Sequence, residues 1–517
     1  MRISIDPDRT RLRGGALRGV KWSALQKVGT RSASLLTFIV LARMLEPQDF
    51  GLVALASAIV MVITMLFDLS LPQYLIQQVE LTRRVIDTAF WCAVALSIVA
   101  ALVIIACAPL VATLLTEPRL TPVLVALACT VPLGSLSAVP QALLRRSLAF
   151  DVISKRSLVG IAASGVVGVS LAASGAGVWA LVLQTYAQLL VSIVLFYGVA
   201  QWRPGLSWDR RESVAMVRYG TTLWGMSSLH FLRLRGDELV VGAILGSVSL
   251  GIYSVAKRMV LFVSDLIGGV VLQVVPSVLA AAKADPERVR RGYLTAIGAS
   301  AAMIAPVTMG LAAVSGVLVP LVFGRQWQGS GAIAQVAAIA AAAIILTQFD
   351  RGLFLALDLP RVELKNMVIT AVLGVGAAAA AAPWGLMSVV LATTGCSYLA
   401  WAWRIRVTQR CADIPARKVL ATLAPVWFAA LLAAALAWGT LLGLGSWSSW
   451  GDLYALLLSG AVLAVAYPPL LRLLARPTVA NLQGFVPARL QRSVATKYLL
   501  RYLLGRPHSG AARHVAA

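Results

Sequence analysis

Charged side chains are scarce in this chain. Asp, Glu, Lys and Arg make up 13% of its 517 residues, whereas 59% are hydrophobic. A soluble protein of this length could not bury so much apolar surface, which excludes an ordinary globular fold. The apolar residues lie in repeated runs of about 20, the length that crosses a bilayer as a helix. The sequence therefore predicts an all-α integral membrane protein.

Cysteine and histidine are also few. The five cysteines form no C-x-x-C pair and mostly lie in apolar runs, which argues against a disulfide framework or a zinc site. Two of the three histidines stand near the C-terminal end of the chain. We therefore expect no metal site, no cofactor and no catalytic residues.

Acidic residues are scarcer than basic ones. The chain has 21 Asp and Glu against 45 Lys and Arg, a net charge of +24. Such an excess can indicate nucleic-acid binding. In a membrane protein it arises from cytoplasmic loops, which are rich in Lys and Arg. We adopt this second interpretation and expect no nucleic-acid partner.

Fourteen transmembrane helices are predicted from the apolar runs. They lie near 22–43, 51–77, 89–115, 122–144, 157–174, 178–200, 218–234, 250–281, 292–322, 330–357, 366–382, 386–403, 419–442 and 453–471. The first lacks an A-x-A-like cleavage site after it and is expected to stay uncleaved. The connections expected inside, among them 404–418, hold 21 Lys and Arg, and those expected outside hold four. This asymmetry predicts that both termini are cytoplasmic.

An internal repeat is suggested by features that recur at offsets of 202, 200 and 204 residues. They are Trp22 and Trp224, the turns Leu45–Gly51 and Leu245–Gly251, and Pro72 and Pro276. Such a repeat predicts two six-helix bundles, 21–210 and 211–410, with a site between them. Two further helices are expected at 411–475. The ends, 1–20 and 476–517, are expected to be basic and cytoplasmic, the tail being either an interfacial helix around 490–503 or disordered.

Several motifs resemble those of a known family. The stretch Leu41–Gly51 is similar to the "LARxLxPxDFG" turn of polysaccharide and oligosaccharide flippases. Arg146–Phe150, Gly177–Leu181 and Leu250–Arg258 are similar to further family stretches in the same order. The resemblance is to Wzx-type flippases of the multidrug/oligosaccharidyl-lipid/polysaccharide exporter superfamily and covers about 15–475. It implies two bundles in a V, with a cleft that opens alternately to either side.

Cations within the predicted spans are candidates for the substrate site. Lys27 and Arg31 share one face of the first span, Arg233 lies on the seventh, and Lys257 and Arg258 lie on the eighth. In a cleft between the repeats they would bind an anionic diphosphate, chiefly through Arg31 and Arg258.

Each candidate also has a structural alternative. Lys27 can extend to the cytoplasmic interface, Lys257 and Arg258 can pack against outer headgroups, and Arg233 can pair with Asp237. Two acids, Asp68 and Asp265, would bind a coupling ion or neutralise nearby arginines. The alternatives for His230, a hydrogen bond within its helix or a role as proton carrier, also stay open.

The resemblance implies a flippase for undecaprenyl-diphosphate-linked oligosaccharide in the bacterial cytoplasmic membrane, serving exopolysaccharide or lipopolysaccharide biosynthesis. Its expected partners are this lipid-linked substrate, membrane lipid, a glycan polymerase and export machinery. One alternative is a cation-coupled drug exporter of the same superfamily, whose often cationic substrates fit a positive cleft poorly. Another is a membrane glycan polymerase or ligase, which usually needs a large outer loop that this sequence lacks.

Overall fold

The computed structural model describes residues 29–67, 71–78, 81–147, 150–200, 202–281, 285–444 and 449–485. Within these ranges all regular structure is helical, without a strand. The predicted all-α class is confirmed. Long apolar runs form helices here because a helix satisfies its backbone hydrogen bonds internally, as a bilayer requires.

Twelve helical segments of the described ranges are long and apolar enough to span a membrane. The predicted number was fourteen, and the difference has two sources. The first predicted span begins outside the described residues, and its described part is a helix at 29–44. The seventh and eighth lie in one element, α8 (Arg210–Ala281), which is interrupted at Gly246 with a φ of 83°. Glycine adopts this left-handed conformation without the steric cost that a Cβ imposes.

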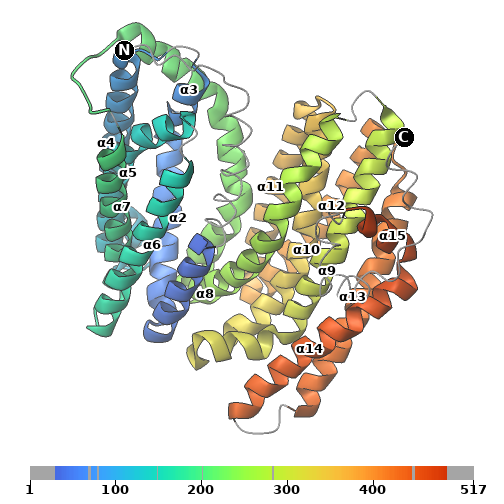
Figure 1. Ribbon diagram of the computed structural model, residues 1–517. Coiled ribbons are helices and arrows are strands. Elements are labelled where there is room, and N and C mark those ends of the chain that lie inside the picture. The colour runs from blue at the N-terminus through green and yellow to red at the C-terminus, as the bar shows by residue number, and fades with distance from the viewer. Residues whose placement is uncertain are drawn as a thin grey trace. The chain divides into compact units, whose positions relative to one another are not determined.

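The chain divides into two compact units, Met1–Ser254 and Val255–Ala517. The first contains the helix at 29–44, α2 (Pro47–Phe67), α3 (Leu71–Gln77), α4 (Arg83–Leu114), α5 (Leu120–Arg146), α6 (Phe150–Ala173), α7 (Val178–Val199) and the first part of α8. Within it α4 packs against α5, α5 against α7, and α6 against α7 (Figure 1). The boundary between the two predicted bundles lies at residue 210 of the sequence, whereas the two units divide after Ser254. The internal repeat from which that boundary was predicted stays a proposal.

The second unit holds the rest of α8, α9 (Pro286–Phe323), η1 (Arg325–Trp327), α10 (Gln328–Ala356), α11 (Pro360–Ala381), η2 (Ala382–Trp384), α12 (Leu386–Ala412), α13 (Ala416–Leu444), α14 (Ser449–Leu474) and α15 (Arg476–Phe485). Helix α9 packs against α10, α13, α14 and α15. Small residues line these contacts: Ala301 and Ala305 of α9 and Ala429 and Ala433 of α13 are fully buried. Small side chains let helix backbones approach closely where lipid supplies no hydrophobic drive for association.

Large apolar side chains are exposed along the helices of both units. Examples are Leu102 and Leu110 on α4, Val194 on α7, and Leu431 and Leu442 on α13. Exposed apolar surface of this extent is unfavourable in water and favourable against lipid tails. Together with the twelve apolar helices, it identifies a multi-pass membrane protein. The possible interfacial helix around 490–503 lies outside the described residues.

Candidate functional site

The predicted substrate-binding cations stand on two helices. In the first unit, Arg31 is exposed on the helix at 29–44 and Arg233 is half-buried on α8. In the second unit, α8 carries a half-buried Lys257 and an exposed Arg258. Lys27 lies outside the described residues. The convergence of these five side chains on one cleft stays a prediction.

The two acids proposed for ion coupling are less fully described. Asp68 lies outside the described residues, and Asp265 belongs to α8. His230 also belongs to α8. The roles of all three residues stay predictions.

Acids near Arg233 have partners on the same helix. The hydroxyl of Tyr253 donates to Asp237 over 2.5 Å. The guanidinium of Arg235 pairs with the buried carboxylate of Glu238 at the same distance. The Tyr253–Asp237 hydrogen bond joins the two sides of the break at Gly246, and the Arg235–Glu238 ion pair lies before the break. Both contacts indicate a structural role for this part of α8.

Another acid in the first unit holds a connection in place. Asp87 near the start of α4 is buried and accepts hydrogen bonds from Trp202 Nε1 at 3.0 Å and Ser207 Oγ at 2.6 Å. Nearby, Trp91 Nε1 donates to the carbonyl oxygen of Gly205 over 2.8 Å. The acceptor oxygens of Asp87 are thus engaged by the segment that leads into α8. This arrangement positions the connection.

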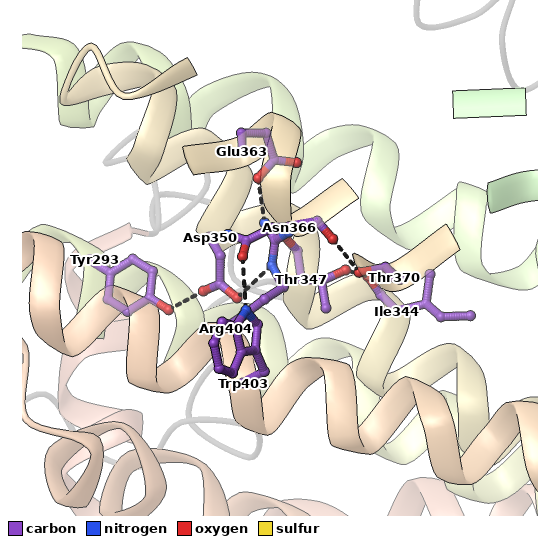
Figure 2. A network of polar contacts seen from close by, with 9 residues as sticks. All are labelled: Tyr293, Ile344, Thr347, Asp350, Glu363, Asn366, Thr370, Trp403 and Arg404. Carbon is purple, nitrogen blue, oxygen red and sulfur yellow. Dashed lines mark hydrogen bonds and ion pairs between the residues drawn. The ribbon is translucent and has the colours of Figure 1, made fainter. Parts of the chain in front are cut away.

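Charged residues in the interior of the second unit form a cluster (Figure 2). Asp350 of α10 has 0% of its surface exposed, and Arg404 of α12 has 4%. Tyr293 of α9 donates its hydroxyl hydrogen to Asp350 Oδ1 over 2.5 Å. Arg404 Nε lies 3.4 Å from Asp350 Oδ2, and Arg404 Nη2 lies 2.8 Å from Glu363 Oε2 of α11. Four helices therefore contribute to one charged cluster, Tyr293–Asp350–Glu363–Arg404.

Further polar contacts surround this charged cluster. Arg404 Nη2 also donates to the backbone oxygen of Thr347 over 3.1 Å. Asn366 Oδ1 accepts from Trp403 Nε1 over 3.2 Å, while its buried Nδ2 has no hydrogen-bond partner in the structure. Asn366 stands on α11, close to Glu363 in sequence (Figure 2). The polar groups thus continue from the ion pairs into the packing of α11 on α12.

Sequence reasoning missed this cluster because it placed Arg404 in a cytoplasmic connection, 404–418. In the structure α12 continues to Ala412, so Arg404 lies inside the helix and is buried. A usable signal was present, since Asp350 ends a long apolar run. An acid at such a position needs a cationic or hydrogen-bonding partner. Which cation it contacts depends on how the helices pack.

No group of three or more His, Cys, Asp or Glu side chains in the described part of the chain could hold a metal ion. The clusters above are instead built from ion pairs and hydrogen bonds. Their chemistry is that of charge neutralisation.

Two relatives are similar over about three fifths of the chain. The succinoglycan biosynthesis transport protein ExoT of Rhizobium meliloti is 27% identical over 310 residues, covering 60% of this chain and 63% of that protein. The lipopolysaccharide biosynthesis protein WzxC of Escherichia coli is 25% identical over 322 residues, covering 61% of this chain and 65% of that protein. The match therefore spans less than two thirds of either relative's own length.

Solved structures are similar over more of the chain. The lipid II flippase MurJ, in an inward closed conformation, matches with a TM-score of 0.72 at 12% identity and covers 89% of this chain and 100% of that one. An inward-facing multidrug transporter of the MATE family, in the MOP superfamily, matches with a TM-score of 0.52 at 14% identity. The match covers 74% of this chain and 95% of that transporter. These likenesses establish the fold. A model of the polysaccharide biosynthesis protein family matches residues 40–332, more than half of the sequence, and the chain belongs to this family.

Proposed function

We propose that this chain is a flippase that carries a lipid-linked oligosaccharide across the bacterial cytoplasmic membrane for exopolysaccharide or lipopolysaccharide biosynthesis. The observation that carries the proposal is its membership of the polysaccharide biosynthesis protein family together with a flippase-like fold. The two relatives named above are a biosynthesis transport protein and a lipopolysaccharide biosynthesis protein. Transport of this kind changes no covalent bond, so the protein would not be an enzyme.

Recognition of the substrate would rest on its undecaprenyl diphosphate. Arg31 and Arg258 are the two exposed residues among the described candidates. A guanidinium can hold two phosphate oxygens through parallel hydrogen bonds. Lys27, Arg233 and Lys257 would add positive charge. The sugar would lie in a polar cleft while the lipid tail stays in the bilayer, and the two bundles would expose the cleft to each side in turn.

The orientation follows from the loop charges. The connections predicted for one side hold far more Lys and Arg than those predicted for the other, even without the buried Arg404, so we expect the basic side to be cytoplasmic and both termini to lie there. A glycan polymerase and export machinery would receive the sugar on the outer side. Either Asp68 or Asp265 would bind a coupling proton or sodium ion.

The test uses the full chain in vesicles that contain a fluorescent undecaprenyl-diphosphate oligosaccharide. A membrane-impermeant reductant bleaches only the outer leaflet of protein-free vesicles. With the protein present, we expect bleaching to continue beyond that fraction, at a rate that rises with protein content. Bleaching that stops at the same fraction as in protein-free vesicles would refute the proposal.

A drug exporter is the second candidate, because the MATE transporter shares the fold at a TM-score of 0.52. Substrates of such exporters are often cationic, and the cations proposed for the cleft of this chain favour an anionic substrate. The same vesicles can be loaded with a cationic dye. Dye export without any translocation of the lipid-linked sugar would favour this second function.

A further inference from the structure

The buried cluster Tyr293–Asp350–Glu363–Arg404 contains two carboxyl groups and one guanidinium (Figure 2). If both carboxyl groups were ionised, the three charges would sum to −1 in a site with little solvent. An uncompensated buried charge is costly, and a buried acid avoids the cost by binding a proton. The composition of the cluster therefore predicts that one of the two carboxyl groups binds a proton, in addition to the proton of the Tyr293 hydroxyl.

The contact distances show which acid is the better ion-paired. Arg404 lies 2.8 Å from Glu363 and 3.4 Å from Asp350. Glu363 stands in the first turn of α11, where the helix dipole favours negative charge, and its side chain is 13% exposed. Asp350 has no exposed surface, and its shorter contact is with a neutral hydroxyl group. Asp350 is thus the natural carrier of the proton.

At this end of α10 the packed helices are α9, α11 and α12. The titratable or charged groups that they bring to Asp350 are Tyr293, Glu363 and Arg404. Of these, only Arg404 is cationic. Loss of the proton from Asp350 would therefore draw the guanidinium toward α10 and away from Glu363, because the two anions compete for one cation.

We propose that Asp350 and Glu363 share Arg404 as a proton-controlled switch. With Asp350 protonated, Arg404 pairs with Glu363 and ties α12 to α11. With Asp350 ionised, Arg404 is drawn to Asp350 and its hold on α11 weakens. The bound ligand is a single proton, and the moving part is the Arg404 side chain. This inference concerns the second unit alone and does not depend on the transported substrate.

Infrared difference spectroscopy of the purified full chain tests the proton. The carbonyl stretch of a protonated buried carboxyl group should titrate in the wild-type protein. Asp350→Asn should abolish this signal because the acid is gone. Glu363→Gln should also abolish it, because Arg404 then pairs with Asp350 alone and no excess negative charge remains. If the signal persists in both variants, or is missing from the wild-type protein, the cluster binds no extra proton and the switch is wrong.

Glu238→Gln is the matched control. Glu238 is buried to a similar degree, but it pairs with the guanidinium of Arg235 in the first unit. We expect its substitution to leave the infrared signal of the second unit unchanged. Should Asp350→Asn fail to fold, Glu363→Gln by itself still decides the question.

Amide hydrogen exchange tests the movement of Arg404. After correction for intrinsic exchange, the first turn of α11 should be about tenfold better protected when Asp350 is protonated, since one charge-assisted hydrogen bond is gained. In Asp350→Asn the protection should be high at every pH, and in Glu363→Gln it should be low at every pH. Protection that changes with pH in the same way in the wild type and in both variants would show that the cluster is only a structural ion pair.

Discussion

Gly51 of α2 and Gly251 of α8 lie backbone to backbone. A Cβ atom on Gly51 would stand 2.9 Å from the amide nitrogen of Gly251, and one on Gly251 would stand 3.2 Å from that of Gly51. Each added Cβ would also overlap a carbonyl oxygen, that of Ser247 for Gly51 and that of Pro47 for Gly251. The two glycines are 200 residues apart in the sequence, and so are Pro47 and Ser247, whose carbonyl oxygens obstruct the added Cβ atoms. The contact is therefore symmetric with respect to the proposed repeat.

Replacing either glycine by alanine should destabilise the protein. Because the obstructing atoms are backbone, relief requires a helix to shift, at a cost of about 1–3 kcal/mol or more. We expect Gly51→Ala and Gly251→Ala to lower the Tm of the detergent-purified chain. Gly439→Ala on α13, where nothing lies within 4 Å, is the control and should not lower Tm, because alanine favours a helix over glycine. Equal Tm values in all three variants would mean that α2 and α8 do not approach so closely.

Removing the cation of the buried cluster should destabilise the second unit. Arg404→Ala leaves Asp350 and Glu363 without their shared partner, and breaking a buried pair in this way costs about 3–5 kcal/mol. Adding Asp350→Asn and Glu363→Gln to Arg404→Ala removes the uncompensated charges, so we expect part of the lost stability to return. Thermal unfolding of the single and triple variants measures both effects. A triple variant less stable than Arg404→Ala would contradict this account.

The proposed diphosphate contacts predict a difference between arginine and lysine. Arg31→Ala and Arg258→Ala should each lose a charge-assisted contact worth about 1.5–3 kcal/mol, or roughly ten- to a hundredfold in affinity. Arg31→Lys and Arg258→Lys should recover only part of it, because an ammonium group cannot make the bidentate contact. Binding of the lipid-linked diphosphate measures these losses. Arg119→Ala, in a connection expected outside, is the control and should leave the affinity nearly unchanged. Wild-type affinity in both Arg31→Ala and Arg258→Ala would exclude the proposed diphosphate contacts.

If Asp68 or Asp265 binds the coupling ion, its substitution should remove gradient-driven transport and spare substrate binding. Asp68→Asn or Asp265→Asn should abolish gradient-driven transport in vesicles and leave binding of the lipid-linked sugar largely intact. The measurement compares translocation with and without an imposed proton or sodium gradient. Unchanged gradient dependence in both variants would leave the two acids as counter-charges, and coupling would then have to be sought at Asp350.

The proposed orientation can be tested with single cysteines in a cysteine-free variant. Ser147 and Ser174 are both exposed; Ser147 follows α5 and precedes α6, and Ser174 follows α6 at its other end. A membrane-impermeant thiol reagent added to intact cells should label Ser174→Cys and spare Ser147→Cys until the cells are opened. Labelling of Ser147→Cys in intact cells would reverse the assignment of inside and outside.

The sequence by itself determined the class and most of the helices. The length of an apolar run against the thickness of a bilayer is a local property, so α4, α5, α7 and α13 fall close to predicted spans. The sequence also aligned Gly51 with Gly251 at the offset of the proposed repeat, and that repeat stays a prediction. It proposed Arg31 and Arg258 as site cations from their place in apolar surroundings, and it could not place them in a common cleft.

Only the tertiary structure decided which side chains meet. Arg404 contacts acids 54 and 41 positions earlier in the chain, and it was expected in a connection until α12 proved to extend past it. The contact of Gly51 with Gly251 and the packing of α13 on α9 are likewise set by the rotation of one helix against another. In a membrane the lipid-facing and protein-facing sides of a helix are both apolar. Hydropathy therefore determines where a helix lies along the chain. Which side of the helix faces the other helices is determined by packing.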